Sequence, residues 1–172
     1  MNIVVQACEK MIAYSQGNLH DIDHFLKVWS LASTIGKQEM ADSAAETVLE
    51  LAAIVHDIAC PLCRIKYGNT LGGNQEKESA PLVKEFFAGL DVPEADVERI
   101  SWLVSHHHTY SPVDGLDHRI LLEADYLVNA GESGYTKEAL LKARERIFAT
   151  STGKRLLDSM FLLGEQQQSA AE

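Results

Sequence analysis

The dipeptide His56-Asp57 is the strongest chemical signal in the sequence. It directly follows the apolar run Leu-Ala-Ala-Ile-Val at residues 51–55. An aspartate beside such a run has to be paired or bound to a cation, because burying a bare carboxylate costs a large amount of free energy. Adjacent residues on a helix point about 100° apart, yet both can reach one ion that lies across the helix end. The dipeptide therefore points to a metal site.

Two distant residues could complete the set of metal ligands. His24 begins a segment in which Val28 and Ile35 share one apolar stripe, so it could reach the ion from the preceding helix. Asp125 lies on an otherwise apolar face within residues 120–128. Facing helices of a bundle commonly build metal sites in this way. A lone His-Asp pair is often only a core or capping feature, so the order of all four residues carries the prediction.

The segment Cys60-Pro-Leu-Cys63 has the spacing of half a redox site or half a zinc site. The chain holds three cysteines and no second pair with this spacing, which makes either interpretation weak. We interpret Cys60 and Cys63 mainly as two buried thiols, although oxidation or stray zinc there could disturb Asp57. An odd number of cysteines also implies no disulfide framework, as expected for reduced thiols in the cytoplasm.

Helical periodicity covers almost the whole sequence and defines the elements that must position these residues. The segments with this period are residues 24–35, 41–55, 75–90, 93–104, 116–129, 136–149 and 152–163. Residues 60–74 carry Pro61 and three glycines, which predicts a long loop. No segment alternates with period two, and no flexible linker divides the chain. The sequence therefore predicts an all-α helical bundle, with a single domain over residues 1–163 and a flexible tail at 164–172.

Composition and charge narrow the class of partner. The chain is 46% hydrophobic and 23% charged, which is typical of a globular protein and argues against disorder. Its formal net charge of -10 disfavours a nucleic acid polymer, because affinity for such a polymer comes from neutralising phosphates. Residues 1–10 lack the pattern of a signal peptide, and no apolar run is long enough to cross a bilayer. We expect a cytoplasmic protein without a membrane partner; no coiled-coil heptad indicates an oligomeric state.

Several stretches of the sequence resemble the HD domain superfamily of metal-dependent phosphohydrolases, in its branch of small single-domain bacterial members. The resemblance spans roughly residues 18–130. The stretches that carry it are His-Asp-Ile-Asp-His-Phe-Leu-Lys-Val at 20–28, Ala-Ile-Val-His-Asp-Ile at 53–58, Ser-His-His-His-Thr-Tyr at 105–110, Asp-Gly-Leu-Asp at 114–117 and Leu-Leu-Glu-Ala-Asp-Tyr-Leu-Val-Asn at 121–129. It implies a compact HD-type helical bundle.

The resemblance also implies a metal site and a hydrolytic reaction. It implies that a divalent ion is held by His24, His56, Asp57 and Asp125. A mixed set of nitrogen and oxygen ligands suits iron, manganese, nickel, cobalt or zinc. Water activated by the metal would attack a phosphate ester or anhydride. The implied substrate is a small phosphorylated metabolite, with a nucleotide as one candidate.

A second metal is an alternative that the resemblance leaves open. In two-metal HD enzymes a later histidine pair contributes ligands, and here His106 and His107 could supply it, with Asp57 bridging. No histidine lies between His56 and His106, where those enzymes have one, but Glu76 or Glu78 could replace it. The competing interpretation is that the three histidines at 106–108 mark a helix C-terminus, where imidazolium complements the helix dipole.

Phosphate binding needs positive charge or backbone donors near the metal. Arg64 and Lys66 are the candidates, since both follow Asp57 closely in the predicted loop. The competing interpretation is that they are ordinary loop charges. His20, at the opening of the HD-like segment, could orient water or phosphate.

Two alternatives to hydrolysis remain from the sequence. Some HD relatives carry a lysine three residues after the aspartate, where this chain has Cys60. Together with the missing middle histidine, this departure leaves open a non-catalytic sensor that uses metal to bind a nucleotide. The second alternative is a di-iron oxygenase, because the same helical cage can hold two irons.

Overall fold

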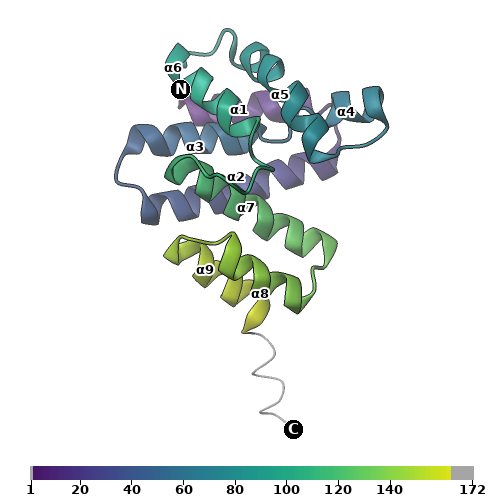
Figure 1. Cartoon of the computed structure of the whole chain (residues 1–172). Helices are drawn as coiled ribbons and strands as arrows, with labels where there is room; N and C mark the ends of the chain where they lie inside the picture. The colour runs from purple at the N-terminus through teal and green to yellow at the C-terminus, as the bar shows by residue number, and fades with distance from the viewer. Residues whose placement is uncertain (1, 164–172) are drawn as a thin grey trace.

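Every regular element of the computed structural model is a helix among residues 2–163, the part of the chain that it describes (Figure 1). The prediction of an all-α bundle is confirmed for these residues, whereas the predicted tail at 164–172 lies outside them. The elements are α1 Ile3–Tyr14, α2 Leu19–Glu39, α3 Ser43–Val55, α4 Cys60–Tyr67, α5 Gly72–Phe87, α6 Glu94–Val104, α7 Gly115–Ser133, α8 Lys137–Arg146, α9 Ser151–Leu157 and the π-helix η1 Asp158–Leu162.

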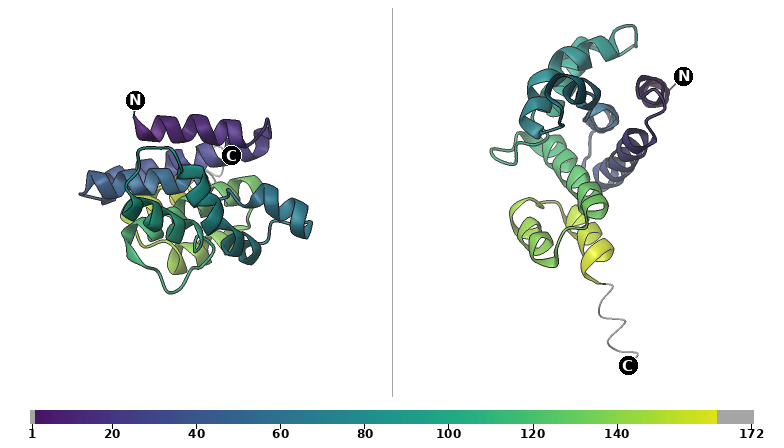
Figure 2. Two further views of the ribbon diagram at one scale, coloured as in Figure 1. Left: turned by 90° about the horizontal axis from the view of Figure 1, so that it is seen from above. Right: turned by 90° about the vertical axis from the view of Figure 1, so that its right-hand side faces the viewer.

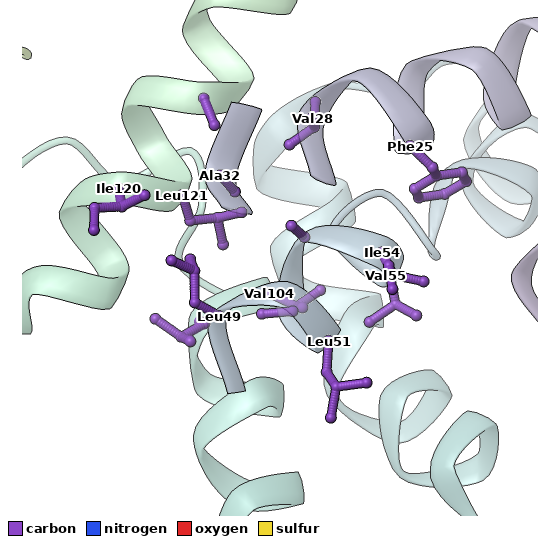
Figure 3. Close-up of a cluster of buried hydrophobic side chains, with 14 of the residues drawn as sticks. Phe25, Val28, Ala32, Leu49, Leu51, Ile54, Val55, Val104, Ile120 and Leu121 are labelled. Carbon is purple, nitrogen blue, oxygen red and sulfur yellow. The ribbon is translucent and has the colours of Figure 1, made fainter. Parts of the chain in front are cut away.

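Helix α3 is the central element of the core. Its residues 51–55 are all buried, and the helix packs against α1, α2, α6 and α7. Figure 3 shows Leu49 and Ile54 of α3 among apolar side chains from α2 and α7. A helical segment that is apolar all round, as residues 51–55 are, has to be enclosed by other elements. The carboxyl end of α3 therefore delivers His56 and Asp57 into the interior.

Helix α2 is longer than its apolar stripe indicated. Its N-cap is Asn18, whose side chain accepts a hydrogen bond from the backbone N–H of Asp21, and it runs past Gly36 to Glu39. A Cβ atom at Gly36 would lie 3.0 Å from Cδ2 of Leu49. The glycine therefore lets α2 approach α3 closely and does not end the helix.

The prediction of a long loop at residues 60–74 is wrong. Helix α4 occupies 60–67, and α5 begins at Gly72 after a short turn. Pro61 lies in the first turn of α4, where a missing N–H costs nothing. Gly68 ends the helix with a φ of 68°, a left-handed conformation that glycine adopts easily. The proline and this glycine thus mark the two ends of a short helix.

The C-terminal elements lie against one side of α7. Figures 1 and 2 show α7 between the pair α8–α9 and the part of the molecule formed by α4–α6. The predicted helix at 152–163 is α9 followed by η1, and the helix predicted to reach residue 149 ends at Arg146. No helix among the described residues is long and apolar enough to cross a membrane.

Candidate metal centre

Four side chains from α2, the end of α3 and α7 converge in the interior. Nε2 of His24 lies 3.1 Å from Nε2 of His56 and 3.4 Å from Oδ1 of Asp125. Nε2 of His56 lies 3.5 Å from the same Asp125 oxygen, and Oδ2 of Asp57 lies 3.7 Å from Nε2 of His24. His56 and Asp125 are buried, and Asp57 opens onto a pocket. The structure thus brings together the four residues that the sequence singled out; we call them the first group.

The Nδ1 protons of the two imidazoles point away from this meeting point. Nδ1 of His56 lies 2.9 Å from the carbonyl oxygen of Ala53, and Nδ1 of His24 lies 2.9 Å from Oε2 of Glu132. Both partners only accept hydrogen bonds, so each Nδ1 donates and each Nε2 of a neutral ring presents a lone pair. When both rings are neutral, as metal binding requires, the two lone pairs and the two carboxylates therefore face one another with no proton between them.

Such a convergence of acceptors fits a cation. Ligands held at about 2.1 Å from one metal ion lie about 3 Å from each other, which is the spacing between the two Nε2 atoms. A set of two imidazoles and two carboxylates matches the preferences of divalent transition metals. His24, His56, Asp57 and Asp125 would hold the ion.

The pKa values of the group reflect the same demand for positive charge. Burial alone would raise the pKa of Asp57 and Asp125, but neighbouring imidazoles hold both well below the usual range. Burial alone would lower the pKa of His24, but a hydrogen bond to Asp125 and the charge of Asp57 raise it to about 9. In the metal-free protein a proton on His24 therefore supplies charge that the carboxylates need.

Two residues of α7 that the sequence analysis missed support the first group. Glu132 accepts from Nδ1 of His24 and also pairs with Nζ of Lys27 at 3.0 Å. Nδ2 of Asn129 donates to Oδ1 of Asp125 at 2.8 Å. The two residues follow Asp125 by four and seven positions, so they share its face of the helix. That spacing was the signal that could have identified them. Such partners orient metal ligands.

A second group shares Asp57 with the first. Ligand atoms of Asp57, His107 and His108 all lie within 4.8 Å of one another. Nε2 of His107 lies 3.0 Å from Oδ1 of Asp57, and its Nδ1 donates to the carbonyl oxygen of Val104 at 2.7 Å. Nε2 of His108 is buried and has no hydrogen-bond partner among the described residues. Burial, and then the charge of His107, lower the pKa of His108 to about 4, so its ring is neutral.

His106 and Glu78, both predicted as ligands of a second metal, lie elsewhere. Nδ1 of His106 donates to the carbonyl oxygen of Trp102, and its ring stacks on the indole at 4.1 Å. Consecutive residues in the turn point in different directions, so His107 and His108 enter the group instead of His106. Glu78 accepts from Nζ of Lys66 at 2.8 Å and from the hydroxyl of Tyr67 at 2.6 Å.

The loop that carries these histidines is fixed from two sides. Glu76 of α5 accepts hydrogen bonds from the backbone N–H of His108 and from Oγ1 of Thr109. The fully buried His118 of α7 joins the ends of the loop: its Nε2 donates to the carbonyl oxygen of His106, and its Nδ1 accepts from the N–H of Asp114. Burial lowers the pKa of His118, which favours the neutral ring that both bonds require. Helix α6 ends before the histidines, which lie in the turn that follows it.

A pocket of about 220 Å³ opens onto Asp57. Arg64 lies at this pocket and makes a bidentate pair with Asp21, at 2.7 and 2.6 Å. His20 also lines it and is largely exposed. Lys66, the other predicted phosphate ligand, does not line the pocket, because it is paired with Glu78. The structure therefore keeps Arg64 and His20 beside the first group and separates Lys66 from it.

Both cysteines of the Cys60-Pro-Leu-Cys63 segment are buried and free, as predicted. Cys60 lines the pocket beside Asp57. Burial raises the pKa of both thiols, and the nearby carboxylates of Asp57 and Glu78 raise it further. A protonated thiol is a poor nucleophile and a poor metal ligand. The two cysteines therefore act as packing residues beside the site.

Two solved structures and one family model are similar to this chain. YpgQ of Bacillus subtilis has a TM-score of 0.64 and 18% identity to this chain, with 99% of this chain and 95% of that one covered. A predicted HD superfamily hydrolase from an uncultured Thermotogales bacterium has a TM-score of 0.62 and 20% identity, with 96% and 90% covered. At these identities the two structures share the fold. No curated protein matches the chain. The HD domain family matches residues 21–130, which include both groups, and the chain therefore belongs to the HD domain family.

Proposed function

We propose that this protein is a metal-dependent phosphohydrolase that acts on a small phosphate ester or anhydride, with a nucleotide as the first candidate. The observation that carries the proposal is the convergence of two imidazole lone pairs with Asp57 and Asp125 beside an open pocket. Membership of the HD domain family supports a metal-dependent hydrolase. When bound, a divalent transition metal supplies a Lewis acid that activates water and polarises a phosphoryl oxygen.

The chain's own residues hold and orient the phosphate. Each terminal guanidinium nitrogen of Arg64 donates one N–H to Asp21. Three of the five N–H donors of the guanidinium therefore remain for a phosphate oxygen. Asp21 is in turn fixed by Nδ2 of Asn18 at 2.9 Å. The pair therefore presents a guanidinium in one orientation at the pocket. We assign the orientation of the attacking water to Asp57, because this residue belongs to both groups.

The number of metal ions remains part of the proposal. The first group is the principal site. The second group, Asp57 with His107 and His108, favours a second ion, because its buried Nε2 of His108 lacks a hydrogen-bond partner among the described residues.

The test is the metal content of protein purified without a histidine tag, followed by turnover of a panel of nucleotides with each metal. Near-stoichiometric metal with release of phosphate or pyrophosphate is the expected result. Tight nucleotide binding without turnover under any metal would favour a sensor, and oxygen consumption with spectroscopic signs of paired iron would favour an oxygenase. Protein that binds no metal under any condition would overturn the assignment of the four ligands.

A further inference from the structure

The carbonyl oxygen of the Gln75 side chain is buried without a hydrogen-bond partner. Gln75 lies in the first turns of α5, it is one of the residues that line the pocket beside Asp57, and it is 3% exposed. Only four buried side-chain polar atoms lack a partner among the described residues, and two of them belong to Gln75 and His108, which both line this pocket. Buried polar groups are nearly always paired, so an exception in a pocket points to a ligand.

The orientation of the Gln75 amide is fixed by its other end. Nε2 donates to the carbonyl oxygen of Thr70 at 3.0 Å. That partner can only accept, so Nε2 cannot exchange places with Oε1. The turn that carries Thr70 is itself held by Asn69, which accepts hydrogen bonds from the N–H of Leu71 and from Nδ2 of Asn74. Oε1 is therefore an acceptor that is held in place before any ligand binds.

An acceptor-only atom needs an O–H or N–H donor from the ligand. Fully ionised phosphate offers only acceptor oxygens, so the donor must come from another part of the molecule. The pocket of about 220 Å³ also contains Asp57, so this donor must lie close to the phosphate group. In a nucleotide or sugar phosphate, the donors nearest the phosphorus are the hydroxyl groups of the sugar.

We propose that Gln75 determines substrate specificity by accepting a hydrogen bond from a sugar hydroxyl of the phosphorylated substrate. The inference rests on the proposed phosphohydrolase function and names its substrate class: phosphate esters or anhydrides of hydroxylated sugars. An analogue that lacks this hydroxyl leaves the buried Oε1 without a hydrogen bond in the complex, and the site therefore discriminates against it.

The test compares adenosine 5′-triphosphate and 5′-monophosphate with their 2′-deoxy, 3′-deoxy and 2′,3′-dideoxy analogues. For the wild-type protein we expect the loss of one particular hydroxyl to lower kcat/KM by about tenfold or more. In Gln75→Met, which keeps the shape and removes the acceptor, that penalty should fall below about threefold. Gln75→Leu also removes the acceptor, with a differently shaped apolar side chain, and should lose the penalty as well. Lys77→Met places the same new side chain at an exposed position of α5 and serves as the control.

The outcomes separate this inference from the proposed function. If no nucleotide is hydrolysed, calorimetric binding of the same panel replaces kcat/KM, and a hydroxyl penalty lost in Gln75→Met supports the inference without hydrolysis. Equal turnover of all analogues by the wild type would overturn it and leave hydrolysis intact. A penalty that persists in folded Gln75→Met would overturn it as well. If Gln75→Met fails to fold, retention of the penalty in Gln75→Leu overturns it and loss of the penalty there supports it. If the protein neither binds nor hydrolyses any nucleotide of the panel, both proposals are overturned.

Discussion

Two turns in this molecule present a histidine to the site with the same local geometry. After α3, Nδ1 of His56 donates to the carbonyl oxygen of Ala53; after α6, Nδ1 of His107 donates to that of Val104. In both cases the acceptor lies three residues earlier, and both Nε2 atoms are directed at the carboxylates. The end of a helix leaves carbonyl groups unpaired, and a histidine just beyond it can use one to fix its own ring.

The two turns differ in how completely they are supported. His56 faces His24 and Asp125, and both of these have a second hydrogen-bond partner on α7. The turn after α6 is followed by a loop that depends on Glu76 and His118, and Nε2 of His108 has no partner among the described residues. The ligands of the first group therefore all have partners within the protein, whereas the second group leaves one ring nitrogen without a partner in the described part of the chain until a ligand binds.

Asp57→Ala should have the largest effect, because Asp57 is the residue that the two groups share. We expect the variant to lose bound metal from both groups and to hydrolyse substrate about a thousandfold or more slowly. Metal analysis and phosphate release measure the two effects, and circular dichroism checks the fold. Asp23→Ala changes an exposed aspartate of α2 and should behave like the wild type. Retention of activity by Asp57→Ala would contradict the proposed function.

His107→Gln and His106→Gln separate the second group from the first. His107 contacts Asp57, whereas His106 stacks on Trp102. We expect His107→Gln to keep the ion of the first group, to lose any second ion and to reduce hydrolysis about a hundredfold. His106→Gln should stay within about threefold of the wild type. Equal losses in both variants would show that the turn acts as one unit, which is not what the contacts imply.

The same two turns explain what the sequence could and could not predict. The first group was visible because Asp57 follows an apolar run and Asp125 interrupts an apolar face, and both patterns conflict with burial unless a cation is bound. Three consecutive histidines carry no such conflict. The direction of each ring is set by the turn after α6, so the sequence could not distinguish His106 from His108.

Helix positions were predicted better than helix ends and connections. The apolar periodicity identified α3 and α7, which the core encloses. The loop predicted at residues 60–74 was wrong because the same proline and glycines serve as helix boundaries and as loop residues. The wrong prediction that Lys66 binds phosphate follows from that error. Lys66 lies on helix α4 and pairs with Glu78, whereas Arg64 on the same helix pairs with Asp21 at the pocket.

Glu132→Gln tests the support behind the first group, with a smaller expected effect. The variant keeps an acceptor for Nδ1 of His24 but removes the charge, so we expect metal affinity to fall about tenfold. Lys27→Met removes the pair with Glu132 and leaves the contact with His24, and its effect should be smaller still. Competition with a chelator measures both affinities. A larger loss in Lys27→Met than in Glu132→Gln would contradict the assigned role of Glu132.

The pH dependence of metal binding should be the mildest effect, and its sign follows from His24. The pKa of His24 in the metal-free protein is raised to about 9, so a proton occupies this imidazole at neutral pH and must leave when metal binds. The pKa values of Asp57 and Asp125 lie well below the usual range, so these carboxylates stay charged throughout.

Affinity for the first ion should therefore weaken as pH falls from about 8 to about 6, by at most about tenfold for each pH unit. Calorimetry in buffers of different ionisation enthalpy should report close to one proton released per ion bound. Glu132→Gln should release less than the wild type, because the loss of this carboxylate removes one of the groups that raise the pKa of His24. A metal affinity that stays constant or rises as pH falls would contradict this prediction. It would mean that no proton on His24 competes with the metal ion at the first group.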